Sequence, residues 1–245
     1  MATRAGTLYL IPVALGEDNA LAVLPTATLH AVRKLRAFVV EDAKSARRFL
    51  RSAGYPYALQ QTRFHALNEH TRESELDALL SPLLAGEDLG LMSEAGCPGV
   101  ADPGEALVRR ALDAGIRVVP LVGPCSILLA LMASGMSGQH FTFHGYLPVD
   151  KAERAQAIKA LEAQAESATQ IFIETPYRSA ALFASLLEHC RGDTRLCVAA
   201  DLTLSSEFVL TRTLGEWKKH PPELDRRPAV FLVYRARPSA TTRHS

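Results

Sequence analysis

The sequence predicts an α/β protein of two domains, the first built on a parallel sheet and the second on a mixed one. Short apolar runs alternate with helical patterns over the first 140 residues, which is typical of strand, helix, strand units. The second half places two helices before a run of strands, which favours a mixed sheet. The 245 residues exceed one usual domain of about 100–150 residues and suit two compact ones.

The first domain is predicted to hold four strands, five helices and a weaker fifth strand near Tyr57–Leu59. The strands are Leu8–Ile11, Ala37–Val40, Asp88–Met92 and Arg117–Leu121. The helices are Thr26–Arg36, Ala43–Ala53, Ser74–Ala85, Glu105–Ala114 and Pro124–Ser134. Gly54, Gly86 and Gly115 each follow a helix, where glycine commonly ends it in the left-handed conformation.

Residues 137–150 change from small and polar to aromatic, so we expect the boundary near Gln139, with domains 1–139 and 140–245. The second-domain strands are Phe141–Tyr146, Gln170–Glu174, Arg195–Ala200, Glu207–Thr213 and Ala229–Tyr234. Its helices are Ala152–Ala165, with Asp150 as its cap, and Ser179–Cys190.

Composition excludes several classes of protein. Apolar residues make up 48% of the chain and the net charge is +1, as in an ordinary globular protein. Four cysteines without a C-x-x-C pair, and no signal peptide, predict a cytoplasmic protein with free thiols. Proline, glycine and arginine interrupt the longest apolar stretch, and the histidine pairs lack a third ligand, so neither a membrane span nor a metal is expected.

The stretch "LMSEAGCPGVADPG", residues 91–104, puts three glycines and two prolines directly after a strand. Small residues also follow the first strand ("PVALG") and the Arg117 strand ("VGPCSI"). Ligands of open parallel sheets bind beyond the carboxyl ends of the strands. No Walker A loop, G-x-G-x-x-G fingerprint or G-x-S-x-G elbow is present. The pattern therefore indicates a ligand held by backbone, one carboxylate and a helix start.

Several segments in order resemble the tetrapyrrole methylase superfamily of S-adenosylmethionine-dependent methyltransferases. They are "LYLIPVALG", "VVEDAKSARRFL", "LMSEAGCPGVADPG", "VVPLVGPCSILLALMASG", "FHGYLP", "IFIETPYR" and "AADLT". Within that superfamily the chain is most similar to the ribosomal RNA small subunit methyltransferase I branch, which methylates a ribose 2′-hydroxyl. The resemblance implies two α/β domains with the cofactor, S-adenosylmethionine, in the cleft between them, and a homodimer.

The resemblance also implies which residues line the cofactor. They are Leu15, Glu94, Val100, Ser126 and Ile127 from the first domain and Thr175, Ala200 and Pro228 from the second. Ser126 is expected in the first turn of a helix, whose free N–H groups suit a carboxylate. The Glu94 carboxylate is expected to accept a hydrogen bond from a ribose or from the methionine ammonium of the cofactor. Its alternative role is a helix-cap or surface carboxylate.

Glu41 and Asp42, at the end of the second strand, are the first candidates for a catalytic base. Their alternative role is a strand-end pair neutralised by nearby cations. Seven basic residues lie between positions 33 and 51, which indicates either a basic face for RNA or two solvated helix faces.

Three functions remain open from the sequence. An RNA 2′-O-methyltransferase is favoured by the branch and the basic segment. A methyltransferase of a small molecule or protein is favoured by the near-neutral charge and by departures from the branch: Glu94 for Asp, Ala43-Lys44 for Thr-Arg, and Leu204 for Lys. The third is a cofactor-binding module without catalysis.

Overall fold

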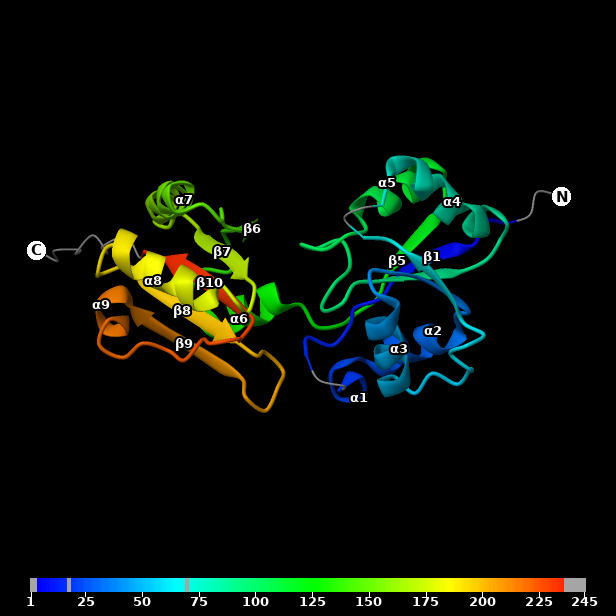
Figure 1. Ribbon diagram of the computed structural model, residues 1–245, viewed down its shortest axis with the longest axis horizontal. Helices are drawn as coiled ribbons and strands as arrows, with labels where there is room; N and C mark the ends of the chain where they lie inside the picture. Colours follow the sequence, from blue (N-terminus) through cyan, green and yellow to red (C-terminus); the bar gives the residue numbers. More distant parts are fainter. Residues whose placement is uncertain (1–3, 17–18, 69–70, 236–245) are drawn as a thin grey trace, which may run out of the picture. The chain divides into compact units, whose positions relative to one another are not determined.

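The computed structural model describes residues 4–16, 19–68 and 71–235, and the chain divides into two compact units, Met1–Cys125 and Ser126–Ser245 (Figure 1). Each unit is built on its own five-stranded sheet. The division falls before Ser126, because the helix after Cys125 contacts strands of the second sheet. The sequence analysis put the boundary later, near Gln139. The boundary near Gln139, with domains 1–139 and 140–245, stays a prediction.

All strands of the first sheet are parallel, in the order β3-β2-β4-β1-β5. They are β1 (Thr7–Leu10), β2 (Ala37–Val40), β3 (Arg63–Ala66), β4 (Leu89–Met92) and β5 (Arg117–Pro120). β2 and β4 are buried along their whole length. Helices cover both faces of a parallel sheet, so its inner strands read as continuous apolar runs.

Helices cover both faces of this sheet. They are α1 (Ala20–Val23), α2 (Thr26–Lys34), α3 (Ala43–Ser52), α4 (Glu73–Leu84) and α5 (Glu105–Asp113). α1, α2 and α3 pack with Phe38 and Met92 into one apolar cluster. α4 and α5 pack with Leu8 and Leu89 into another. The sheet therefore lies between two helical layers.

The second sheet is mixed, in the order β6-β7-β10-β8-β9. Its strands are β6 (Phe141–Tyr146), β7 (Thr169–Glu174), β8 (Arg195–Ala200), β9 (Phe208–Thr213) and β10 (Ala229–Tyr234), of which only β6 and β7 pair in parallel. The helices are α6 (Ser126–Ser134), α7 (Lys151–Gln164), α8 (Ser179–His189) and α9 (Leu214–Trp217). α7, α8 and α9 form one core with Phe172 and Phe231, and α6 packs against β8, β9 and β10.

The predicted fold class is confirmed, with a parallel first sheet and a mixed second one. The predicted strand near Tyr57–Leu59 is wrong, since the fifth strand is β3, six residues downstream of Tyr57. β3 is an edge strand with exposed and half-buried side chains, so it carries little apolar signal. Tyr57 packs instead against Arg36, whose guanidinium carbon lies 3.0 Å from the ring centroid. The short helices α1 and α9 were not expected.

Candidate active site

The carboxyl ends of β1 and β4 lie side by side, and the loops that follow them run to opposite faces of the sheet. The chain leaving β1 passes to α1 and α2 on one face. The chain leaving β4 passes to α5 on the other. Ligands of open α/β sheets bind where neighbouring loops part in this way. The loops 11–16 and 93–104 are therefore the candidate ligand-binding loops of the first unit.

Two backbone hydrogen bonds join these loops. Val13 N donates to Gly96 O at 2.8 Å, and Gly96 N donates to Val13 O at 3.1 Å. Gly96 has a φ of 71°, which side chains rarely adopt. A Cβ atom at Gly96 would lie 3.4 Å from Leu15 Cδ2. This local geometry explains why the loop after β4 places glycine there.

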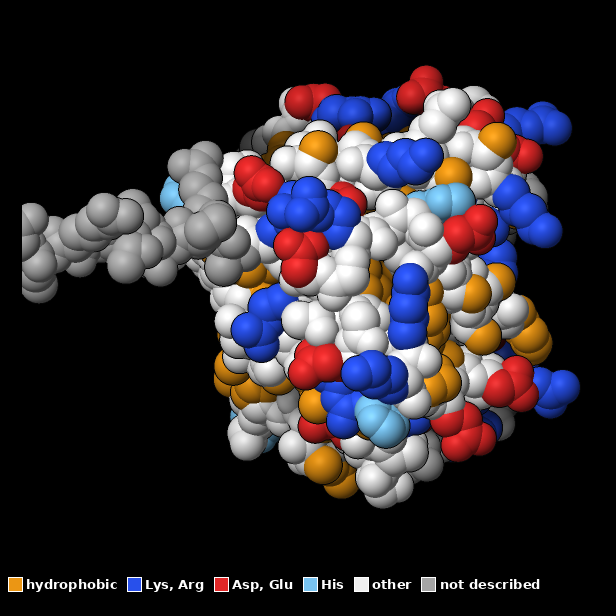
Figure 2. Space-filling model, turned by 90° about the vertical axis from the view of Figure 1, so that its left-hand side faces the viewer, with side chains coloured by type: hydrophobic (Ala, Val, Ile, Leu, Met, Phe, Trp, Pro, Cys, Tyr) orange, Lys and Arg blue, Asp and Glu red, His pale blue; other side chains and the backbone are white. Residues whose placement is uncertain are grey.

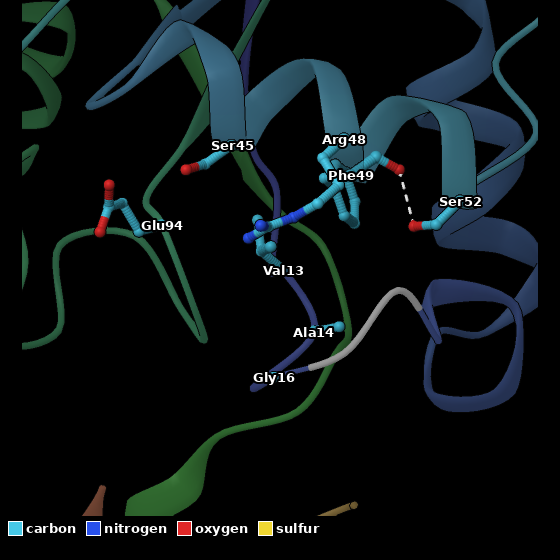
Figure 3. Close-up of a pocket in the computed structure, with 8 residues that line it drawn as sticks. All are labelled: Val13, Ala14, Gly16, Ser45, Arg48, Phe49, Ser52 and Glu94. Atoms are coloured by element: carbon cyan, nitrogen blue, oxygen red, sulfur yellow. Dashed lines mark hydrogen bonds between the residues drawn. The ribbon is translucent and has the colours of Figure 1, made fainter. Parts of the chain in front are cut away.

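A shallow hollow opens between these loops and α3 (Figure 3). Its lining residues are Val13, Ala14, Gly16, Ser45, Arg48, Phe49, Ser52 and Glu94. Figure 3 shows Ser45 and Arg48 reaching from α3 into the space between the helix and the loop of Glu94. The hollow thus combines small residues, one cation and one carboxylate.

Of the three first-domain loop residues that the resemblance implies, one lines the hollow. Glu94 is exposed and lines the hollow. Leu15 is half-buried between the lining residues Ala14 and Gly16. Val100 lies further along the β4 loop, 43% exposed, and does not line the hollow. Their role toward a cofactor stays a prediction.

Asp42, one of the two predicted bases, is the N-cap of α3. Its Oδ2 accepts from Ser45 N at 2.7 Å and from Ser45 Oγ at 2.8 Å. These hydrogen bonds, led by that from the Ser45 backbone, lower the pKa of the Asp42 carboxyl. Glu41 is half-buried directly after β2. Of the two, Asp42 has the clearer structural task.

Asp102 is a candidate that the sequence analysis did not single out. It lies half-buried on the β4 loop, next to Ala101, whose φ is 64°. Burial raises the pKa of the Asp102 carboxyl, and the nearby charge of Glu94 adds to the rise, while a hydrogen bond from Ser93 opposes it. A carboxyl tuned in this direction suits general-base chemistry. The only signal in the sequence was its place in the stretch of residues 91–104, which is rich in glycine and proline.

The residues predicted in the second domain gather at one edge of the second sheet. Ala229 is opposite Glu174 on β7 and opposite Ala200 on β8. Thr175 follows Glu174 and Pro228 precedes Ala229, so Thr175, Ala200 and Pro228 share this edge. In Figure 1 the arrowheads of β7 and β8 and the start of β10 meet there.

Ser126 and Ile127 begin α6, as predicted for Ser126. At the other end of the helix, Ser134 O accepts from Thr211 Oγ1 on β9 at 2.7 Å. Three residues later, Ser137 O accepts from Thr169 Oγ1 at the start of β7 at 2.8 Å. The chain after α6 is thus held where β7 begins. Figure 1 shows that α6 itself starts near the end of β7, at the edge of the sheet described in the preceding paragraph.

The thiols are free, as expected. Cys97 Sγ lies 3.5 Å from Pro124 O, and its thiol meets that of Cys125. That contact, with burial, raises the pKa of the Cys97 thiol. The Cys97 thiol is therefore a poor nucleophile at neutral pH.

The part of the chain that the structure describes brings together no three His, Cys, Asp or Glu residues able to hold a metal ion. Within residues 4–16, 19–68 and 71–235, every helix is too short or too polar to cross a bilayer.

The fold and the gathered loops define a class: a two-unit α/β protein with small-residue loops at one edge of each sheet. Two solved structures share this fold. The methyltransferase CobJ has a TM-score of 0.62 at 17% identity, covering 95% of this chain and 94% of its own. Diphthine synthase has a TM-score of 0.63 at 16% identity, covering 94% and 90%. At these identities the likeness shows the fold alone.

Sequence relatives are closer. The family described as tetrapyrrole (corrin/porphyrin) methylases matches residues 7–218. Ribosomal RNA small subunit methyltransferase I of Pseudomonas aeruginosa is 33% identical over 232 residues, 94% of this chain and 79% of the relative. The protein of that name from Mesorhizobium japonicum is 35% identical over 229 residues, 92% and 74%. The chain belongs to the tetrapyrrole methylase family and is a methyltransferase.

Proposed function

We propose that the protein transfers a methyl group from S-adenosylmethionine to a ribose 2′-hydroxyl of small-subunit ribosomal RNA. The observation that carries the proposal is the hollow at the joined β1 and β4 loops, in a chain whose relatives of about one-third identity bear the name ribosomal RNA small subunit methyltransferase I. Both loops belong to the segment that matches the methylase family.

The residues at the hollow fit such a cofactor. Ala14 and Gly16 are small, so a ligand approaches their backbone closely. Glu94 is an exposed carboxylate, which accepts hydrogen bonds from donors such as a ribose hydroxyl or an ammonium group. When bound, the cofactor supplies an electrophilic methyl group on a sulfonium. In the second unit we propose that the edge formed by Thr175, Ala200 and Pro228 contributes further contacts.

The protein's own contribution is alignment and proton removal. Holding donor and acceptor in line can supply about 7–11 kcal/mol of the barrier. A base that takes the hydroxyl proton adds about 10²–10⁴ in rate. We propose Glu41 and Asp102 for this task, since the Asp42 carboxylate caps α3 and has a lowered pKa. Glu41→Gln and Asp102→Asn separate them, because only loss of the base lowers the transfer rate with cofactor affinity unchanged.

Nucleoside mass spectrometry tests the function. We expect one 2′-O-methylated nucleoside to disappear from small-subunit RNA of cells lacking the gene and to return when the gene is restored. The purified protein should also transfer labelled methyl from S-adenosylmethionine to the unmodified RNA or subunit. Label that enters a small molecule or a protein instead would assign the activity to the other acceptor class, and cofactor binding without turnover would indicate a binding module.

We also propose that the protein works in the cytoplasm as a homodimer, as the family resemblance implies. Apolar side chains on α6 support the dimer, since Met132 is 81% and Leu128 49% exposed. Light scattering on the purified protein measures the oligomeric state, and a monomer at micromolar concentration would contradict it.

A further inference from the structure

Charge alone does not mark an RNA-binding surface on this protein. The net charge of the chain is +1. Of the basic residues between positions 33 and 51, Arg33, Arg36 and Arg47 pack against groups of their own unit. On the face drawn in Figure 2, Lys and Arg side chains lie among Asp and Glu side chains. An RNA acceptor therefore needs contacts of another kind, and unpaired bases commonly stack on aromatic rings.

Tyr177 presents such a ring. Its side chain is 87% exposed, and no other large apolar side chain of the described residues is more exposed. It is the third residue of a tight turn between β7 and α8, which Arg178 N closes by donating to Thr175 O at 3.0 Å. Pro176 is the second residue, where the fixed φ of proline favours a turn. The turn therefore carries the ring to the surface of the second unit.

Hydrogen bonds hold this turn at both ends. Glu174, 5% exposed, accepts from Thr175 N at 2.7 Å and from Arg178 Nε at 2.9 Å. Ser179 Oγ donates to Thr175 O at 3.0 Å and to Arg227 O at 2.9 Å. Because the backbone below the ring is already ordered, a ligand that stacks on the ring pays little entropy for ordering it. The exposed ring is thus a pre-organised contact.

A second turn adjoins the first and carries a cation. Arg226 is its third residue, and Arg227 N closes it by donating to Leu224 O at 3.3 Å. The φ of Arg226 is 54°, at a turn position where glycine or asparagine is usual. Strained backbone of this kind gathers at ligand sites. The side chain of Arg226 is exposed, and the bond from Ser179 to Arg227 joins its turn to that of Tyr177.

Both turns lie at the edge of the second sheet to which the proposed function assigns cofactor contacts. Tyr177 is two residues from Thr175, and Arg226 is two residues from Pro228. Two residues of extended chain span at most about 7 Å. A methyl acceptor has to reach the cofactor, so the nucleotides next to the methylated one pass close to these turns.

We infer that the Tyr177 ring stacks on an unpaired base of the acceptor RNA beside the methylated nucleotide, and that Arg226 binds an adjoining phosphate. The inference rests on the proposed function, since it takes the acceptor to be RNA. Every base has a face that can stack, so Tyr177 holds the strand without selecting its sequence. The guanidinium of Arg226 offers paired donors that fit two oxygens of a phosphate.

The test of the ring compares Tyr177→Ala with Tyr177→Phe. The probe is a small-subunit ribosomal RNA transcript, titrated at several salt concentrations. We expect Tyr177→Ala to weaken RNA binding roughly tenfold without changing the slope of log affinity against log salt, because the ring carries no charge. Tyr177→Phe keeps the ring and should bind as the unchanged protein does. Phe141→Ala, which removes a 42% exposed ring at the start of β6, is the control and should also bind normally.

The test of the cation uses the salt slope. Arg226→Gln should flatten this slope by about 0.7 for the lost phosphate contact. Lys219→Gln, an exposed change after α9, is the matched charge control and should leave the slope as it is. Equal flattening in the two variants would overturn the role of Arg226, since only general charge would then matter. RNA binding that is unchanged in Tyr177→Ala would overturn the stacking.

Two other occupants of the ring give different results. Calorimetry without RNA should find the same affinity for S-adenosylhomocysteine in Tyr177→Ala and the unchanged protein, because the proposed cofactor contacts stay in place. A loss of that affinity with RNA binding intact would overturn the inference and assign the ring to the cofactor. A changed oligomeric state by light scattering, with RNA binding intact, would assign the ring to a second copy of the chain instead.

The outcomes also separate this inference from the proposed function. RNA methylation that persists with normal RNA binding in Tyr177→Ala refutes the stacking and leaves the function standing. If the unchanged protein neither binds nor methylates the RNA, both fail together. Circular dichroism and thermal unfolding of each variant confirm that the comparison is made on folded protein.

Discussion

Acidic residues end strands in both sheets, but the two sheets use them differently. Glu94, beyond β4, is exposed and makes no hydrogen bond or ion pair with any other residue that the structure describes. Glu174, the last residue of β7, is 5% exposed and accepts from Thr175 N at 2.7 Å and from Arg178 Nε at 2.9 Å. A strand-end carboxylate therefore indicates a ligand site only where its own domain does not already pair it.

Asp201 repeats the pattern of Glu174 one strand away. It follows β8 and accepts from Arg227 Nε at 2.7 Å and from Ser206 Oγ at 3.0 Å. Its φ of 51° belongs to a tight turn that these bonds hold. In the mixed sheet, β8 and β9 are antiparallel neighbours, so a short turn joins them at this edge. In the parallel sheet every strand end opens into a longer connection, which leaves more room for a ligand.

The first prediction tests the structural half of this comparison. Arg178→Met leaves the buried Glu174 carboxylate without its cation. We expect the free energy of unfolding to fall by about 2 kcal/mol, below the about 3–5 kcal/mol of fully buried pairs, because the Arg178 side chain is 30% exposed. Urea unfolding measures the change. Adding Glu174→Gln to this variant should recover part of the loss, and a fall below about 0.5 kcal/mol in the single variant would show that the pair is not needed.

The second prediction tests the functional half. Glu94→Gln removes a charge that makes no bond within the described chain, so the free energy of unfolding should change by less than about 0.5 kcal/mol. Affinity for S-adenosylhomocysteine should fall roughly tenfold, because a hydrogen bond to a charged group is lost. Calorimetry measures this affinity. Glu105→Gln, an exposed change at the end of the same loop, is the control and should bind normally.

The sequence predicted the inner strands well, because continuous apolar runs such as those of β2 and β4 occur where both faces are covered. It missed β3, whose pairing with β2 alone requires no apolar pattern. Helix ends were also predictable where a single residue decides them: Asp150 caps α7 by accepting from Ala152 N and Glu153 N, as expected.

The candidate site was predictable only as a loop, and two of its side chains were not identified. Arg47 and Arg48 are adjacent arginines, and nothing in the sequence distinguishes them. The packing of α3 against the sheet decides that Arg48 reaches the hollow while Arg47 lies over the Phe64 ring. Asp102 is half-buried because the loop doubles back at Gly99, Ala101 and Gly104, all with positive φ. Such a path depends on tertiary contacts, and no short pattern specifies it.

The third prediction concerns the end of β2, where a carboxylate of the first sheet is structural. Asp42→Ala removes the N-cap of α3 and should lower the free energy of unfolding by about 1 kcal/mol. Asp42→Asn keeps a capping oxygen but loses the charge, so it should lose less stability than Asp42→Ala, and the methyl-transfer rate should stay close to that of the unchanged protein. Denaturation and a single-turnover assay check the two variants. An asparagine variant that is stable but inactive would make Asp42 the base and place it with Glu94 among the functional acids.

The last prediction uses pH to divide the acids of the first sheet. Burial raises the pKa of Asp102 above its ordinary value of 3.8. At lower pH both the folded and unfolded states hold the proton, so this carboxyl costs the fold nothing. As pH rises through the folded pKa, the buried charge forms and stability is lost.

Asp102→Asn should therefore gain stability over the unchanged protein as pH rises from about 4, the ordinary pKa of an aspartate, through the raised pKa of the folded state. Asp42→Asn should show the opposite slope, since the lowered pKa of Asp42 gives the unchanged protein stability that is present above about pH 4 and lost on acidification. Urea midpoints across this range measure both differences, and subtraction removes groups that titrate alike in each protein. Parallel slopes for the two variants would mean that the β2 and β4 ends hold their carboxylates in equivalent surroundings, against the division argued above.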